Sequence, residues 1–127
     1  NVRSSIAPHS QEANPGMIRL VFWNLAGIAQ KLIEDDWGAF VDCYDICLFQ
    51  ETWSVNDVHR SGYTNYCVNA RSAVRGRPSG GLTIWVKTTF PGKVKQLSIN
   101  SLDLLGLKIE INRRKPIFLF NAYSRTV

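Results

Sequence analysis

Two short, almost wholly apolar segments constrain the fold more than any other feature of this sequence. Residues 17–23 read MIRLVFW and residues 45–50 read DICLFQ. Such runs are typical of strands buried on both faces of a sheet. Between Ile28 and Tyr44, apolar residues recur at intervals of three and four, as in an amphipathic helix. A strand, a helix and a strand in this order predict a parallel pair with a right-handed crossover.

The remainder of the chain is rich in expected strands. A short helix is predicted at Ser54–Arg60, because Ser54 is a suitable N-cap. The β-forming segments that follow are separated by turn residues and lie at 63–69, 82–87, 93–100, 102–112 and 116–122. The sequence therefore predicts an α/β domain over residues 17–127, with a mixed β-sheet covered by one main helix. Residues 1–16 contain two prolines and no periodicity, and we expect a flexible amino-terminal arm there.

The predicted sheet has too little cover. Its strands at 17–23, 45–50 and 117–120 are apolar on both faces, so both sides of the sheet need a neighbouring layer. Only one long amphipathic helix is available. We therefore expect the other face to be covered by a second copy of the chain in a homodimer, or by a second half-domain. The chain begins without methionine and stops soon after a strand-like run, so we also expect it to be a piece of a longer protein.

Charge is distributed unevenly along the chain. Residues 1–57 carry three basic and eight acidic side chains, whereas residues 58–127 carry twelve basic and two acidic ones. A positive carboxy-terminal half favours a polyanionic partner such as DNA, and a solvated basic surface is the alternative. No apolar window is long enough for a membrane helix, and the start lacks the order of a signal peptide. These features predict a soluble, intracellular protein.

The odd number of cysteines argues against a disulfide framework. Cys43 and Cys47 have a spacing that a zinc site can use, but no second pair or nearby histidine completes four ligands. We expect Cys43, Cys47 and Cys67 to be reduced, and to behave as small apolar side chains.

Polar residues stand at the carboxyl ends of the first two expected strands. Asn24 follows the first strand and Glu51 follows the second. A parallel pair brings these ends together at the edge of the sheet where ligand sites form. An isolated carboxylate after an apolar run suits a hard cation such as Mg²⁺. A simply solvated carboxylate is the alternative that the spacing leaves open.

Five motifs occur in the order and approximate spacing of the endonuclease/exonuclease/phosphatase superfamily. They are WNLAG at 23–27, DICLFQETW at 45–53, GY at 62–63, SGGLTI at 79–84 and NAYS at 121–124. Over about residues 17–127 the chain resembles the amino-terminal half of these enzymes, in particular the apurinic-type endonucleases of non-LTR retrotransposons. The resemblance implies half of a four-layer α/β sandwich and family chemistry in which magnesium assists cleavage of phosphodiester bonds in DNA.

The resemblance also implies roles for individual residues. Glu51 would bind the metal, Asn24 would orient the scissile phosphate or a metal-bound water, and Tyr123 would contact the phosphate or stabilise its transition state. The Ser79-Gly80-Gly81 turn would be structural. The family's later Asp-x-Asn and Asp-His motifs have no counterpart in this chain, and we therefore expect it to be inactive alone.

The loop before the Gly-Gly turn carries Arg71, Arg75 and Arg77. Such a loop can lie along a nucleic-acid backbone, with aromatic residues available for stacking. The aromatic candidates are Tyr63, Tyr66 and Trp85. A solvated loop is the alternative. Three functions remain in view: a nuclease domain, a catalytically dead module that dimerises or binds nucleic acid or protein, and a phosphatase of small molecules, which the arginine loop disfavours.

Overall fold

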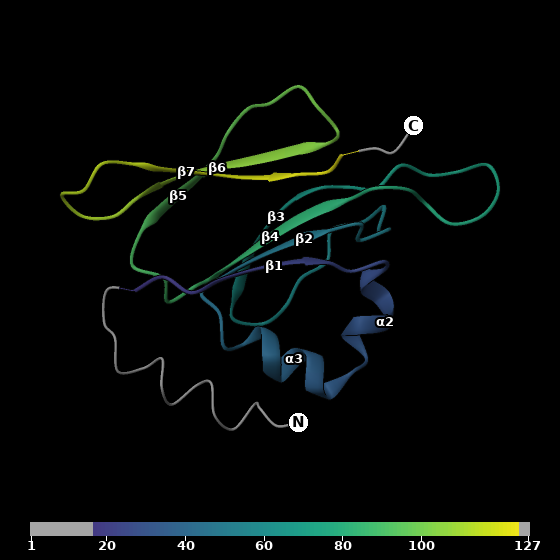
Figure 1. Ribbon diagram of the computed structural model, residues 1–127, viewed down its shortest axis with the longest axis horizontal. Helices are drawn as coiled ribbons and strands as arrows, with labels where there is room; N and C mark the ends of the chain where they lie inside the picture. The colour runs from purple at the N-terminus through teal and green to yellow at the C-terminus, as the bar shows by residue number, and fades with distance from the viewer. Residues whose placement is uncertain (1–16, 125–127) are drawn as a thin grey trace.

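The computed structural model describes residues 17–124, which form three layers (Figure 1). Two short helices lie against a four-stranded sheet of order β1-β2-β4-β3, and a three-stranded sheet of order β5-β6-β7 packs on its other face. The elements are β1 (Leu20–Asn24), α2 (Ile28–Leu32), α3 (Asp35–Val41), β2 (Ile46–Gln50), β3 (Tyr63–Val68), β4 (Leu82–Lys87), β5 (Lys93–Gln96), β6 (Leu104–Glu110) and β7 (Ile117–Ala122). The expected arm at 1–16 lies outside the described residues.

The first sheet is mixed, as predicted. β1 and β2 are parallel, with Leu20 opposite Ile46 and Asn24 opposite Gln50, and the α2–α3 segment makes the connection between them. β4 is antiparallel to both β2 and β3. β2 is buried on both faces, because it lies between β1 and β4 and between the helices and the second sheet.

The prediction of one main helix is wrong. Glu34 adopts an extended conformation, with φ −95° and ψ 116°, and separates α2 from α3. Asp35 and Asp36 then occupy the first turn of α3, where acidic side chains interact favourably with the helix dipole. The break leaves Ile33 74% exposed while Trp37 is buried. The Ser54–Arg60 segment is not helical either, because the Ser54 hydroxyl bonds to the backbone of Asn56 in a local turn.

Two apolar cores hold the layers together. The core between the two sheets contains eight buried side chains from β2, β4 and β6: Ile46, Leu48, Leu82, Ile84, Val86, Leu105, Leu107 and Ile109. The core between the first sheet and the helices contains Leu25, Ile28, Trp37, Val41, Cys47, Phe49 and Trp85. Alternate residues of β2 and β4 therefore serve different cores, as the two-residue period of a strand requires.

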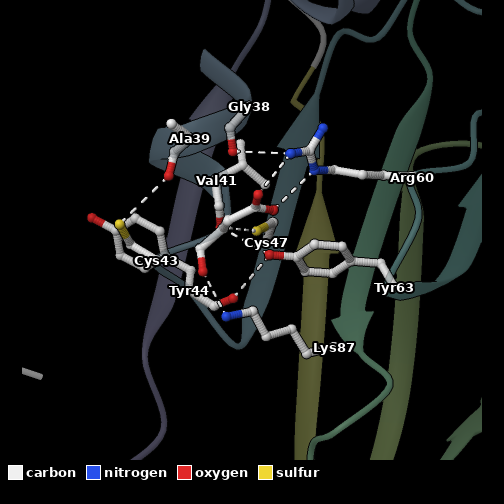
Figure 2. A network of polar contacts seen from close by, with 10 residues as sticks. Gly38, Ala39, Val41, Cys43, Tyr44, Cys47, Arg60, Tyr63 and Lys87 are labelled. Carbon is white, nitrogen blue, oxygen red and sulfur yellow. Dashed lines mark hydrogen bonds and ion pairs between the residues drawn. The ribbon is translucent and has the colours of Figure 1, made fainter. Parts of the chain in front are cut away.

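Side chains from three other segments satisfy the carboxyl end of α3 (Figure 2). Arg60 donates to both Asp42 carboxylate oxygens, at 3.0 and 2.8 Å, and to the Gly38 carbonyl at 3.2 Å. Lys87 donates to the Asp42 carbonyl at 2.5 Å, and the Tyr63 hydroxyl lies 3.0 Å from the Val41 carbonyl oxygen. Side-chain donors near a helix carboxyl end add hydrogen bonds at its last carbonyl groups, and those of Gly38 and Val41 also accept from backbone N–H groups. The network fixes this short helix on the sheet.

Two of the three cysteines are small buried side chains, as the sequence predicts, whereas Cys67 is half-buried and makes polar contacts. All three are free thiols, and Cys43 and Cys47 are buried. Burial raises the pKa of the Cys47 thiol to about 12, which makes it a poor nucleophile. The pKa of the half-buried Cys67 is raised to about 11, chiefly by burial and then by its contact with the Asp57 carboxylate.

Two strands expected to be buried on both faces are exposed on one face. In β1, Phe22 is 56% exposed, and in β7, Phe118 and Phe120 are 53% and 46% exposed. The second sheet packs on the first over β2, β3 and β4, while Leu20 and Phe22 of β1 are exposed. No helix of residues 17–124 covers the outer face of the second sheet (Figure 1). The chain therefore covers most of the first sheet itself. The exposed apolar surface lies on β1 and on the outer face of the second sheet, not over a whole face of the first sheet as predicted. No helix within 17–124 is long and apolar enough to span a membrane.

Asn121 links the two sheets through the middle of the sandwich. It projects from β7, is fully buried, and donates to the carbonyl oxygens of Phe49 at 3.0 Å and Thr83 at 3.2 Å. Its own amide oxygen accepts a hydrogen bond from Gln50 at 2.6 Å. One side chain thereby joins β7 to both β2 and β4.

We predict that Asn121→Ala destabilises the fold by about 3 kcal/mol, because it leaves buried carbonyl groups and the Gln50 amide without partners. The free energy of unfolding, measured by urea denaturation, is expected to fall without a large change in its dependence on denaturant. Asn100→Ala, at an exposed loop position, is the matched control and should change stability by less than about 0.5 kcal/mol. A loss below about 1 kcal/mol for Asn121→Ala would contradict this role.

Candidate active site

Asn24 and Glu51 lie together at the carboxyl ends of β1 and β2. The Asn24 side-chain nitrogen donates to a Glu51 carboxylate oxygen at 2.8 Å. The sequence predicts this proximity, and the parallel register produces it, because Asn24 is opposite Gln50 and Glu51 is the next residue. The bond occupies one lone pair of the carboxylate and leaves others free to bind a cation or a water.

The backbone around this pair is held in an unusual conformation. Ala26, Glu51 and Trp53 have φ values of +50°, +52° and +57°, in the left-handed region that costs a non-glycine residue about 1–2 kcal/mol. Arg113 is the one other such residue between positions 17 and 124. Strained residues that gather in one place are typical of functional sites.

Hydrogen bonds between three chain segments hold that conformation. Gly27 donates to the Glu51 carbonyl and Ile28 to the Thr52 carbonyl, both at 2.9 Å. On the other side, Thr52 donates to the Gly81 carbonyl at 3.2 Å. Gly81 has φ +96°, and a Cβ at this position would clash with the Thr52 hydroxyl. The Gly-Gly turn therefore has the structural role that the resemblance implies.

Tyr123 lies at the same end of the sandwich as Glu51. It follows Asn121 by two residues, and Asn121 bonds to Gln50, the neighbour of Glu51. The ends of β1 and β7 point the same way in Figure 1. The Tyr123 amide donates to the Asp103 carbonyl at 2.9 Å, and its half-buried ring packs against the core between the sheets.

Glu51 is the carboxylate that the hydrogen bond to Asn24 places at this site. No group of three or more His, Cys, Asp or Glu side chains suited to a metal ion is present in residues 17–124. Mg²⁺ is often held by one or two carboxylates together with substrate phosphate oxygens and water. Glu51 therefore fits as one ligand of such an ion, and the chain's described part offers no complete protein cage.

The three loop arginines have different surroundings. Arg71 forms an ion pair with Asp103 at 2.6 Å, and its backbone pairs with Ser79. Because Asp103 also bonds to Tyr123 through its carbonyl group, Arg71 helps to support the tyrosine turn. Arg75 is exposed. The guanidinium carbon of Arg77 lies 4.0 Å from the centre of the Trp53 ring.

The expected stacking residues are not all available. Trp85 is fully buried and donates its indole N–H to the Val58 carbonyl at 3.1 Å, so its prediction as a stacking surface is wrong. Tyr63 is engaged at the end of α3, and Tyr66 packs against the core between the sheets. Trp53 is the aromatic residue beside the arginine loop. It could have been suspected from its place in the Gln-Glu-Thr-Trp motif, but the sequence does not show which loop would reach it.

A scan of protein-family models and a search of curated proteins found no match to this chain. Its function is therefore inferred from its own residues and their geometry, together with the motif resemblance described above.

Proposed function

We propose that this chain is an endonuclease-like domain, of the type found in non-LTR retrotransposons, that supplies one half of a magnesium-dependent site for cleaving phosphodiester bonds in DNA. The observation that carries the proposal is the bond between Asn24 and Glu51 at the carboxyl ends of parallel strands. Residues 17–124 supply three layers of a four-layer α/β sandwich, because helices cover the outer face of the first sheet and no helix of these residues covers that of the second.

The side chains at this end of the sandwich suit a phosphate substrate. The carboxylate of Glu51 binds a hard cation, which supplies charge neutralisation at the phosphate when present. Asn24 fixes the orientation of that carboxylate and retains a second amide hydrogen for a phosphate oxygen or a water. Tyr123, positioned through Asn121, offers a hydroxyl that can donate to a developing negative charge.

We predict that Glu51→Gln abolishes divalent-cation binding at this edge. With Mn²⁺ as a paramagnetic substitute for Mg²⁺ and a short DNA duplex, the side-chain amide signal of Asn24 in NMR spectra should broaden in the unmodified protein. Glu51→Gln keeps the size of the side chain but removes its charge, so the broadening should be lost. Glu110→Gln, which removes an exposed carboxylate of β6, is the matched control. Equal broadening in both variants would rule out Glu51 as the metal ligand.

We also predict that the chain alone does not nick DNA appreciably. Groups that act as a unit in catalysis lose several powers of ten in rate when essential members are missing, and the sequence lacks the family's general base and half of its metal ligands. Supercoiled plasmid incubated with Mg²⁺, and with EDTA as the control, should remain supercoiled. A clear nicking rate that Glu51→Ala abolishes would show instead that the site is complete.

The second candidate function is a catalytically dead module that dimerises, and the exposed apolar surface of the second sheet favours it. Phe118 and Phe120 point away from the sandwich, because their partners in the ladder, Lys108 and Gly106, alternate with the β6 residues that lie in the core between the sheets. Ile99 lies against the same face, since a Cβ on Gly106 would contact both Ile99 and Phe120. We call Ile99, Phe118 and Phe120 the outer patch. A second copy presenting the same patch would cover it with two-fold symmetry.

We predict that the chain is a homodimer in solution, with a mass by light scattering of twice the 14.3 kDa of one chain. Phe120→Asp places a charge in the outer patch and should give a monomer. Ile33→Asp changes an apolar residue of similar or greater exposure on the helical side, and should leave the dimer intact. A well-behaved monomer for the unmodified chain, or dissociation by both variants alike, would contradict dimerisation through this face.

A further inference from the structure

Half of the positive charge of the carboxy-terminal part of the chain gathers on the second sheet and its turns. Residues 58–127 contain twelve basic side chains, and six of them fall within residues 88–124. No ion pair joins any of these six to a carboxylate within residues 17–124. We call the six residues the basic end: Lys93, Lys95, Lys108, Arg113, Arg114 and Lys115.

Most other basic side chains of residues 58–124 are engaged within the protein. Arg60 and Arg71 form ion pairs, at 2.8 and 2.6 Å. Lys87 donates to a carbonyl group at the end of α3, and Arg77 stacks on an indole ring. Arg75 is exposed. The charge that favours a polyanionic partner is therefore concentrated on the second sheet and not around the candidate active site.

The β6–β7 turn and the candidate active site lie at opposite ends of the sandwich. β7 runs from that turn to Tyr123 (Figure 1). Its six residues span about 20 Å at the rise of a strand. Arg113, Arg114 and Lys115 precede β7, whereas Tyr123 follows it. A DNA segment lying across the carboxyl ends of β1 and β2 would have to bend to reach the turn, and bending DNA costs free energy.

Two lysines of the basic end face each other across the second sheet. Lys95 of β5 is directly opposite Lys108 of β6, on the outer face of the sheet. Like charges in this position are destabilising, and a bound anion offsets that cost. Lysine on an edge strand also discourages the addition of a further strand, which accounts for Lys95. It does not account for Lys108, because β6 is the central strand.

The turn between β6 and β7 holds an arginine in a conformation that favours glycine. The Arg114 amide donates to the Ile111 carbonyl at 3.0 Å and closes a four-residue turn. Arg113 is the third residue of this turn and has φ +59°, where glycine or asparagine is usual. A residue kept in an unfavourable backbone conformation is typical of a functional position.

A hollow of about 560 Å³ adjoins the same turn. Lys93, Arg113 and Arg114 stand around it, Glu110 is the one acidic residue of its lining, and Phe90 forms part of its apolar wall. A concave surface with an excess of one charge and walls of low dielectric constant focuses the electric field. The hollow therefore attracts an anion more strongly than the same charges would on a flat surface.

We propose that the basic end binds the sugar-phosphate backbone of a second DNA duplex segment, without preference for its sequence. Contacts to phosphate position a protein on DNA but carry no sequence information. Each arginine of the turn can bind a phosphate group with two parallel hydrogen bonds. Duplex DNA carries about one charge per 1.7 Å of its axis, whereas an extended acidic peptide carries about one per 3.4 Å. A cluster of six cations therefore matches DNA better than it matches a peptide.

The first test locates the bound DNA. A short DNA duplex is titrated into the ¹⁵N-labelled chain in the presence of EDTA, so that no metal ion contributes, and the backbone amide signals are followed by NMR. We expect the signals of Lys95, Lys108 and Arg114 to shift more than that of Arg75. Shifts confined to the arginine loop, or no saturable shift at all, would overturn the proposal.

The second test removes the same charge from two places. Arg113→Gln together with Arg114→Gln should weaken duplex binding at least tenfold. It should also reduce the slope of log affinity against log salt concentration by about 1.8, because each phosphate contact contributes about 0.9. Arg75→Gln together with Arg77→Gln removes an equal charge from the arginine loop and should have a smaller effect on both. Equal losses in the two double variants would show that net charge alone attracts DNA.

The third test separates binding from folding at the turn. Arg113→Gly suits the backbone at φ +59°, so the variant should unfold at a urea concentration no lower than that of the unmodified chain. Its affinity for the duplex should nevertheless fall. Unchanged affinity would remove Arg113 from the surface.

Two other polyanions test the class of partner. Polyglutamate and vesicles of anionic lipid are compared with the duplex at the same salt concentration, and each should bind at least tenfold more weakly. An equal affinity for either would overturn the assignment to DNA.

The basic end does not depend on the proposed nuclease function. Duplex binding in EDTA that shifts the signals of the basic end would support it, even where Mn²⁺ has no effect at Asn24. A Mn²⁺ effect that depends on Glu51, without binding at the basic end, would retain the metal site and overturn this proposal.

Discussion

The buried amide of Asn121 is the interaction on which the arrangement of the two sheets depends. Apolar side chains between sheets favour contact but tolerate sliding, because dispersion and hydrophobic burial have little directional preference. The three hydrogen bonds of Asn121 do have direction, and they reach two carbonyl groups on different strands and the Gln50 amide. In a medium of low dielectric constant, misplacing these partners carries a large penalty. The position of β7 is therefore specified relative to β2 and β4, and with it the position of Tyr123.

The site beyond Asn121 is organised by backbone geometry more than by side-chain contacts. Glu51 and Trp53 have left-handed backbone conformations, and hydrogen bonds from neighbouring segments maintain them. Gly27 and Gly81 permit those segments to approach, since a side chain on either would meet Trp53 or Thr52. As a result the carboxylate of Glu51 and the ring of Trp53 are oriented before any ligand arrives. Orientation in advance reduces the entropy that binding must overcome.

Local periodicity predicts the positions of the strands and their parallel pairing. It does not predict features that depend on contacts between segments far apart in the sequence. The apolar runs identify β1 and β2, and the order of elements gives their parallel pairing and the contact between Asn24 and Glu51. A two-residue period, however, shows only that the faces of a strand alternate; it does not show which sheet the strand joins. The period therefore predicts neither the second sheet nor the exposure of Phe118 and Phe120. The sequence does not predict the break at Glu34, because the apolar spacing continues through it. Trp85 could not be assigned to the interior, because burial depends on β4 lying between β2 and β3.

The surface that the chain leaves uncovered and the site that it leaves incomplete are connected through β7. Among the strands of residues 17–124 it pairs only with β6, so within that part of the chain its other edge is open. It lies over β2 and β4, while Leu20 and Phe22 of the adjacent β1 face outward without cover. A strand added to that edge would lie over β1 and would have one of its ends beside Tyr123 and Asn24. Covering the exposed side chains of β1 and bringing further polar groups to the carboxylate are therefore geometrically linked, whereas the outer patch would need a separate cover. A polypeptide that covered β1 would therefore be placed to bring polar groups to Glu51.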